Sequence, residues 1–211
     1  MDGGFGWSLR AKGTRLYARV YFGPVEAVQE YETGTDDSVP VFWFSDDAPV
    51  FGQTTVFRTI ILNETQLSGL SDRGREYVVQ HERGHLRRPP VRTAVFWGLI
   101  LGCFALSWAA FTVLLTLLRS GISSTLVLVL GLTILSSLLS FVLASRIEET
   151  AAELFALRRL GEAAFLESKR EIRPRSDQSV FTRLFVLLMY PRPGTVVKID
   201  ESIRRVRGCV E

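Results

Sequence analysis

The two histidines of this chain, the only two among its 211 residues, are four positions apart in the segment His81-Glu82-Arg83-Gly84-His85. Residues i and i+4 of a helix share one face, so both imidazoles could bind a single tetrahedral Zn²⁺. Glu82 is then placed as a general base that deprotonates water for attack on a peptide carbonyl. This HExxH spacing predicts His81 and His85 as metal ligands and Glu82 as a catalytic residue. The competing interpretation is a pair of histidines on the exposed face of an amphipathic helix.

Two long segments without a charged residue follow this motif, at residues 93–118 and 120–145. Within them, residues 94–118 and 125–144 are long enough to span the hydrocarbon core of a bilayer. The alternative is a pair of core helices in a soluble protein, but the rest of the chain is too small to cover them. The sequence therefore predicts a mainly α membrane protein with a two-span transmembrane hairpin, and the lipid bilayer as a partner.

Basic residues are unevenly distributed around the predicted hairpin. Its turn carries only Arg119, whereas arginines crowd both flanks: Arg83, Arg87, Arg88 and Arg92 before the first span, and Arg146, Arg158 and Arg159 after the second. By the positive-inside rule, both soluble portions are expected on the cytoplasmic side of the cell membrane. These arginines also account for the formal net charge of +3. No basic stretch is interleaved with aromatic residues, so no nucleic acid is expected as a partner.

The hairpin divides the chain into four predicted segments. Residues 1–40 form an N-terminal region, expected to be partly mobile, with loose strand-like alternation at residues 15–23 and a loop at residues 32–38. Residues 41–93 form the first half of a soluble domain and contain the HExxH helix. Residues 94–144 form the hairpin, and residues 145–211 form the second half of the soluble domain.

The first half of the soluble domain begins with two predicted strands, at Val39–Phe44 and at residues 54–62. Both are rich in β-branched and aromatic residues. The helix that carries the HExxH motif is expected to begin at an N-cap formed by Ser71 or Asp72. Pro89 and Pro90 should end that helix before the first span.

The second half of the soluble domain is predicted to be helical. Residues 146–169 contain strong helix formers, with Gly161 as the main breaker. The apolar segment at residues 179–190 is too short to cross a membrane and contains Arg183, which favours a buried helix. A turn at residues 191–194 then precedes a basic helix at residues 200–207.

A catalytic zinc with two histidine ligands needs a third protein ligand and one open position. Glu148, Glu149 and Glu153 all head the helix that follows the second span. Because two crossings return the chain to the side it left, each of these carboxylates could reach the histidines. Glu149 and Glu153 lie one helical turn apart on a shared face, whereas Glu148 is rotated by ~100° from Glu149.

Three features of the chain resemble the HtpX-like membrane zinc metallopeptidases, which are gluzincins related to the CAAX prenyl proteases. The first is the segment LSGLSDRGREYVVQHERGHLR, and the second is the pair of spans directly after it. The third is SRIEETAAELFALRRLG, in which Arg146, Glu149, Ala152 and Glu153 fall on the positions of the family's second motif and Gly161 on a downstream glycine. The resemblance covers roughly residues 40–207.

This resemblance implies an α+β zincin-like catalytic domain assembled from both sides of the hairpin. It implies Glu149 as the third zinc ligand, with Glu153 supporting a histidine ligand, and one Zn²⁺ per chain as cofactor. It further implies a hydrolase, a metalloprotease that cleaves membrane or membrane-proximal protein substrates for quality control.

The chain also departs from the family pattern. It has no pair of spans ahead of the HExxH motif, and Glu153 replaces the usual aspartate, a side chain one methylene shorter. The family's proline-asparagine-alanine-phenylalanine stretch appears only as Pro49-Val50-Phe51, and Tyr190 replaces a histidine near the C-terminus.

Two other classes of protein are weighed against the metallopeptidase. A catalytically silent membrane adaptor or regulator would be expected to have lost the base or a ligand. Here the base and all three candidate ligands are present, as Glu82, His81, His85 and Glu149. An intramembrane protease of the site-2 type would carry HExxH inside an apolar span, whereas HERGH is flanked by charged residues.

Overall fold

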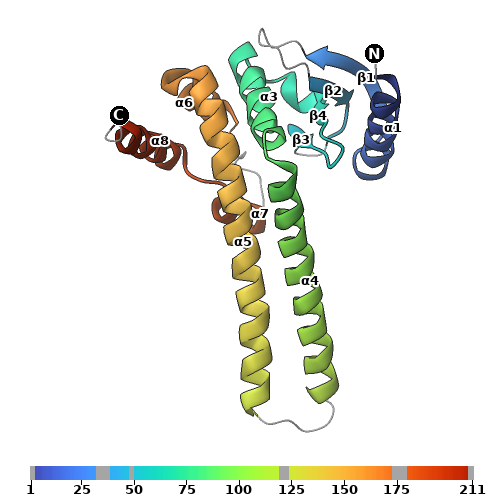
Figure 1. Cartoon of the computed structure of the whole chain (residues 1–211), viewed down its shortest axis with the longest axis vertical. Coiled ribbons are helices and arrows are strands. Elements are labelled where there is room, and N and C mark those ends of the chain that lie inside the picture. Colours follow the sequence, from blue (N-terminus) through green and yellow to red (C-terminus); the bar gives the residue numbers. More distant parts are fainter. Residues whose placement is uncertain (1–2, 32–38, 48–49, 119–123, 173–179, 209–211) are drawn as a thin grey trace. The chain divides into compact units, whose positions relative to one another are not determined.

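The computed structural model describes residues 3–31, 39–47, 50–118, 124–172 and 180–208, and it is mostly helical with one small sheet (Figure 1). Its contacts divide the chain into two compact units. The first comprises residues 1–87, 151–178 and 192–211, and the second comprises residues 88–150 and 179–191. The expected loop at residues 32–38 and the hairpin turn at residues 119–123 lie outside the described residues.

The first unit contains a four-stranded sheet in the order β1-β2-β4-β3. β1 (Val25–Tyr31) is antiparallel to β2 (Val39–Phe44), β2 is parallel to β4 (Ile60–Asn63), and β3 (Gly52–Thr54) is antiparallel to β4. The strand predicted at Val39–Phe44 is therefore confirmed.

The strand predicted at residues 54–62 is wrong as a single element, because the chain reverses there and forms the separate strands β3 and β4. Arg58 has a φ of 59°, a left-handed conformation that suits a turn and not a strand. Thr55 and Thr59 close the turn, with a backbone hydrogen bond of 2.9 Å from the Thr55 amide to the Thr59 carbonyl and a bond of 2.7 Å between their hydroxyls.

The two central strands are buried on both faces, which explains their nearly continuous apolar sequences. One face contributes Val41, Ile60 and Leu62 to a core shared with α3 (Asp72–Leu86), α6 (Glu162–Glu171) and α8 (Pro193–Gly208). The other face contributes Phe42, Phe44 and Ile61 to a cluster with Ala18 of α1 (Gly3–Tyr21). Burial of each large apolar side chain contributes roughly 1.5–3 kcal/mol, so the first cluster holds α3 against one face of the sheet and the second holds α1 against the other.

The strand-like alternation at residues 15–23 is also misleading, because α1 is a helix as far as Tyr21. Thr14 and Ala18 are fully buried, four positions apart, while Leu16 and Val20 are exposed. A spacing of four between buried residues is typical of a helix that lies on a sheet. In so short a segment, with few apolar residues on the buried face, the sequence alone does not distinguish this helical period from the alternation of a strand.

α3 carries the HExxH motif and begins as predicted. Ser71 is its N-cap, and its side-chain oxygen accepts a hydrogen bond of 3.1 Å from the amide of Gly74. The helix ends at Leu86, before the two prolines, and the next helix, α4 (Pro90–Leu118), begins at the second of them. Proline suits the first position of a helix because that amide would have no partner in any case.

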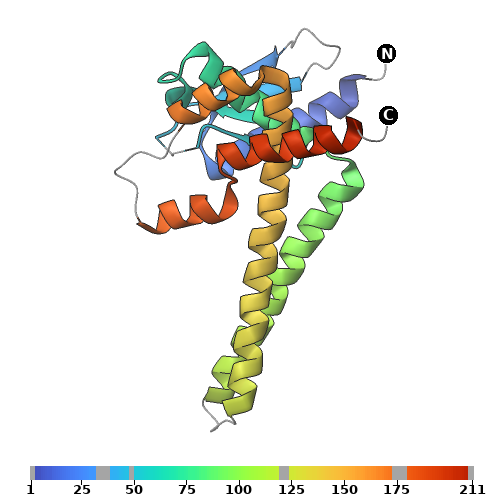
Figure 2. The same cartoon turned by 90° about the vertical axis from the view of Figure 1, so that its left-hand side faces the viewer.

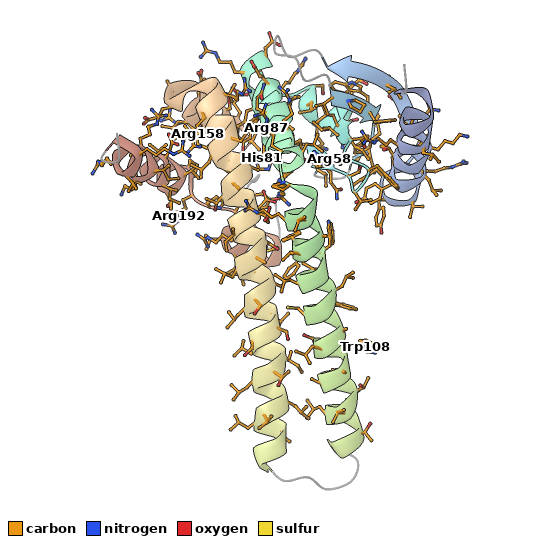
Figure 3. All side chains as sticks on the ribbon, viewed as in Figure 1. Arg58, His81, Arg87, Trp108, Arg158 and Arg192 are labelled. Carbon is orange, nitrogen blue, oxygen red and sulfur yellow. The ribbon has the colours of Figure 1, made fainter. Side chains whose placement is uncertain are left out.

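The second unit contains α4, the part of α5 (Ser124–Leu160) up to Thr150, and α7 (Val180–Met189). α4 and α5 are long and apolar enough to cross a membrane: the most apolar 18-residue windows within Ala94–Thr116 and Val127–Leu160 have mean hydropathies of 2.1 and 2.5. Only 6% of the most apolar window of each is buried, which disagrees with two core helices of a soluble protein. Figure 3 shows mainly hydrocarbon side chains along both helices, with Trp108 pointing away from α4.

The helix predicted at residues 146–169 is a direct continuation of the second apolar segment. α5 runs without interruption to Leu160, and Gly161, with a φ of 81°, separates it from α6. The same helix therefore contains both the apolar segment and the carboxylates Glu148, Glu149 and Glu153.

Two expectations for the C-terminal segment need correction. α7 is a helix as predicted, but several of its large apolar side chains are exposed instead of buried. α8 begins at Pro193, well before the predicted residue 200.

Asp200 on α8 pairs with Arg158 on α5 and with Arg204. Burial alone would raise the pKa of the Asp200 carboxyl, but these two guanidinium groups outweigh it and hold the pKa below its usual value.

The backbones of α3 and the end of α5 pack closely against each other at Gly84. A Cβ placed on Gly84 would lie 2.7 Å from the Cα of Ala152 and 3.1 Å from the Cβ of Phe155. Such distances are too short for any side chain, so the glycine inside the HExxH motif allows the two helices to meet.

We expect Gly84→Ala to destabilise the protein by about 1–3 kcal/mol, because the added methyl group forces two backbones apart. Alanine favours a helix over glycine by up to about 1 kcal/mol, so the clash must exceed that gain. Gly194→Ala is the matched control, since a Cβ at this helical position on α8 meets nothing within 4 Å. Thermal unfolding in detergent measures both. A Gly84→Ala variant as stable as the control would contradict the close packing.

Candidate metal centre

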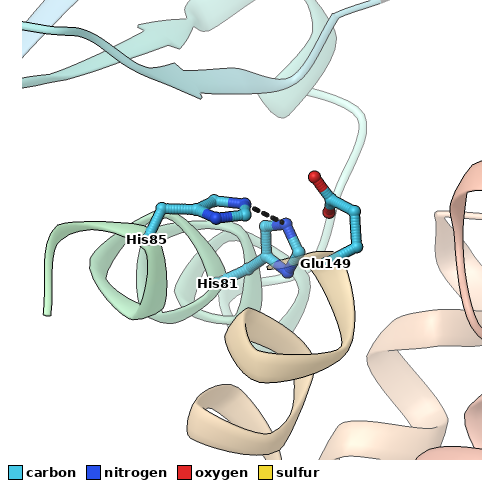
Figure 4. A group of neighbouring side chains, drawn as sticks. All are labelled: His81, His85 and Glu149. Carbon is cyan, nitrogen blue, oxygen red and sulfur yellow. Dashed lines mark hydrogen bonds between the residues drawn. The ribbon is translucent and has the colours of Figure 1, made fainter. Parts of the chain in front are cut away.

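The two histidines of α3 point their Nε2 atoms at each other. These atoms are 3.2 Å apart, and the ring planes are nearly perpendicular, at 89° (Figure 4). Two nitrogens that bind one tetrahedral zinc at about 2.0–2.1 Å lie roughly 3.3 Å apart, so the observed separation fits a shared ion. A hydrogen bond between one protonated and one unprotonated nitrogen would have a similar length.

His81 is only 8% exposed, which contradicts the interpretation of the motif as decoration on an exposed helix face. Buried imidazoles need polar partners, and the Nε2 atoms of His81 and His85 both face the space between the two rings. The other atoms that face this point decide what it can bind.

Glu149, from the adjoining part of α5, completes a group that could hold a metal ion. One ligand atom each from His81, His85 and Glu149 lie within 4.8 Å of one another, and Figure 4 shows the carboxylate beside the two rings. Two imidazoles and one carboxylate form a donor set typical of catalytic zinc. Two of these residues are the ligands that the HExxH spacing predicts, and Glu149 is the third ligand that the resemblance implies.

Glu153 lies on the other side of His81 and is completely buried. Its Oε1 atom is 3.5 Å from the Nδ1 of His81. The same oxygen accepts hydrogen bonds of 2.7 Å from the Tyr77 hydroxyl and 2.8 Å from the Lys169 ammonium group. A carboxylate beside Nδ1 favours a proton on that nitrogen and leaves Nε2 free to bind a metal, as second-shell carboxylates do.

Tyr77 and Lys169 were not identified from the sequence. Tyr77 is four residues before His81 and shares its helix face, which is a signal that could have identified it. Lys169 is on α6, and no local pattern connects it to the motif. Its ammonium group also lies 3.0 Å from the Tyr77 hydroxyl, so the three side chains form a closed polar cluster behind His81.

Glu82 is buried and held by a residue of the sheet. Its Oε2 atom accepts a hydrogen bond of 2.7 Å from the hydroxyl of Thr54, the last residue of β3. The same hydroxyl lies 2.9 Å from the Glu82 carbonyl oxygen. Thr54 was missed in the sequence because the expected single strand hid the turn that brings it to α3.

Glu148, the third carboxylate considered from the sequence, has a different environment. In the second unit it forms ion pairs with Arg88 and with Arg92, the latter at 3.0 Å. Two of the arginines that precede the first span are therefore partners of this carboxylate, and Glu148 is not in the candidate metal group.

Searches against protein-family models, curated proteins and solved structures find no match for this chain. The function of the site is therefore argued from its residues and their geometry.

Variants of the three carboxylates should separate their roles. Glu149→Ala should abolish zinc retention, because only two protein ligands would remain. Glu153→Gln keeps an acceptor for Tyr77 and Lys169 but removes the charge beside His81, so zinc affinity should fall by ~10–100-fold. Glu148→Ala should keep the affinity for zinc, although the loss of its ion pairs should lower stability.

Zinc titration against a competing chelator, with circular dichroism to check folding, measures these effects. Loss of zinc in the folded Glu148→Ala variant alone would mean that Glu148, and not Glu149, is the third ligand.

Proposed function

We propose that this chain is a membrane-bound zinc endopeptidase of the HtpX-like type, which hydrolyses peptide bonds of membrane or membrane-proximal proteins on the cytoplasmic side. Protein quality control is the role that the resemblance implies. The observation that carries the proposal is the convergence of His81, His85 and Glu149, with Glu82 one position from the first ligand.

In this proposal His81, His85 and Glu149 hold one zinc ion per chain. The ion supplies Lewis acidity, which polarises the scissile carbonyl and acidifies water. Glu82 accepts the proton of the attacking water and passes it to the leaving amine. Thr54 holds the Glu82 carboxylate, and Glu153 keeps the proton of His81 on Nδ1.

The sheet offers a place for an extended substrate. β3 is last in the strand order β1-β2-β4-β3, so one of its edges has no neighbouring strand within the sheet. An extended peptide can add to such an edge through main-chain hydrogen bonds. Thr54, at the end of β3, bonds to Glu82. A peptide paired with β3 would therefore pass close to the proposed base.

The membrane location is supported by the exposed apolar surfaces of α4 and α5. Large exposed apolar patches are unusual on soluble monomers and mark membrane or protein contacts. The sidedness is proposed from the arginines around the hairpin alone.

The second candidate is a catalytically silent membrane adaptor or regulator that retains the metallopeptidase fold. It would bind zinc with the same residues but cleave nothing. The presence of Glu82, and its bond to Thr54, favours the enzyme.

Glu82→Gln should retain zinc and lose cleavage by ~10²–10⁴-fold, because an amide cannot accept the proton of the attacking water. Glu76→Gln is the control, since Glu76 is an exposed glutamate on the same helix. Cleavage of casein by the zinc-loaded protein in detergent, with and without chelator, measures both. A wild-type protein that binds zinc but cuts neither casein nor membrane proteins would support the adaptor instead.

Reporter fusions test the sidedness. A fusion at Ser123 should be external, while fusions before Thr93 or after Glu162 should be cytoplasmic, because arginine-rich flanks are retained inside. The reverse pattern would place the candidate site on the outer face and change the class of substrates it meets.

A further inference from the structure

α7 presents an apolar face that nothing in the described part of the chain covers. Val180, Leu184, Leu187 and Leu188 are 83%, 53%, 56% and 41% exposed. These positions are spaced as i, i+4, i+7 and i+8, so they form one stripe along the helix. Met189, on the opposite face, is buried.

The edge of this stripe carries polar side chains. Arg183 and Tyr190 are both exposed, and helical geometry places them next to each other beside Val180 and Leu187. Arginine and tyrosine are the side chains that place a polar group in water while their apolar parts remain in lipid. The exposed stripe of α7 is therefore apolar and is bordered by two side chains that suit the boundary between lipid and water.

Its position along α5 also fits an interface. The Arg146 guanidinium donates a hydrogen bond of 3.4 Å to the carbonyl oxygen of Leu188. Arg146 is the first charged residue after the uncharged segment at residues 120–145, so it marks the end of the lipid-spanning part of α5. This hydrogen bond therefore places the C-terminal end of α7 beside the residue of α5 at which the uncharged segment ends.

The orientation and length of α7 exclude a third crossing. Within the second unit α7 runs across α5 and not along it (Figure 2). Its 10 residues span about 15 Å, half of the hydrocarbon thickness of a bilayer.

We propose that α7 lies in the plane of the membrane interface, with Val180, Leu184 and Leu187 among the lipid acyl chains. The lipid contact continues the exposed apolar surface of α4 and α5, which belong to the same unit. Glu149 lies less than one turn beyond Arg146 on α5, so α7 fixes the depth of the third ligand near the bilayer surface. This inference rests on the membrane crossing in the proposed function, but not on zinc or on catalysis.

Site-directed spin labelling of the full chain in phosphatidylcholine–phosphatidylglycerol vesicles tests the inference. Single cysteines replace Leu184 or Leu187 in a background carrying Cys103→Ala and Cys209→Ala. Leu139, 60% exposed in the apolar part of α5, is the lipid control. Glu167, an exposed residue of α6, is the aqueous control. Collision with oxygen reports lipid exposure, and collision with a water-soluble nickel chelate reports water exposure.

Labels at Leu184 and Leu187 should collide more often with oxygen than with the chelate, as at Leu139, and the reverse should hold at Glu167. Labels that behave as at Glu167 would overturn the inference, since α7 would then face water. Exclusion of both reagents would also overturn it, because a protein would then cover the stripe. A chelate-accessible Leu139 would instead overturn the membrane crossing, which distinguishes failure of the proposed function from failure at α7 alone.

Discussion

The close approach of α3 and α5 at Gly84 and Ala152 is the contact on which the candidate site depends. Neither residue has a side chain large enough to separate the two backbones, and so Glu153 reaches both Tyr77 and His81. Hydrogen bonds of 2.7–2.8 Å weaken steeply when their partners separate. A displacement of these helices would therefore release the carboxylate from His81 and the histidine from its orientation.

α5 continues without interruption on both sides of this contact. Glu149 and Glu153 are one turn apart on this single helix and so share one of its faces. The same helix contains the apolar segment that is long enough to cross a membrane. A soluble enzyme could supply its third ligand from any element, whereas here the proposed ligand and the proposed membrane anchor belong to the same helix.

Local patterns predicted the features that local sequence determines. Periodicity, capping preference and segment length were enough to predict four features: the helix that carries HExxH, its Ser71 cap, the strand at Val39–Phe44 and the two long apolar helices. Features set by tertiary contacts were missed or wrong. Residues 15–21 belong to a helix whose Ala18 packs on the sheet. The turn at Arg58 needs a left-handed conformation, and no glycine in the sequence marks it. Lys169 and Thr54 join the site from distant elements.

The polar groups behind His81 argue for a functional site over a merely stable fold. Glu153, which is completely buried, forms an ion pair with the partly exposed Lys169, and apolar residues of similar volume would often be at least as stabilising. Their presence is therefore not explained by stability. A carboxylate on the Nδ1 side of a histidine has a specific effect, because it fixes the tautomer and directs Nε2 toward a ligand. In this chain that nitrogen faces the Nε2 atom of a second imidazole, that of His85. The Glu153 carboxylate, on the Nδ1 side of the His81 ring, thus orients the Nε2 atom on the other side, which can bind a ligand.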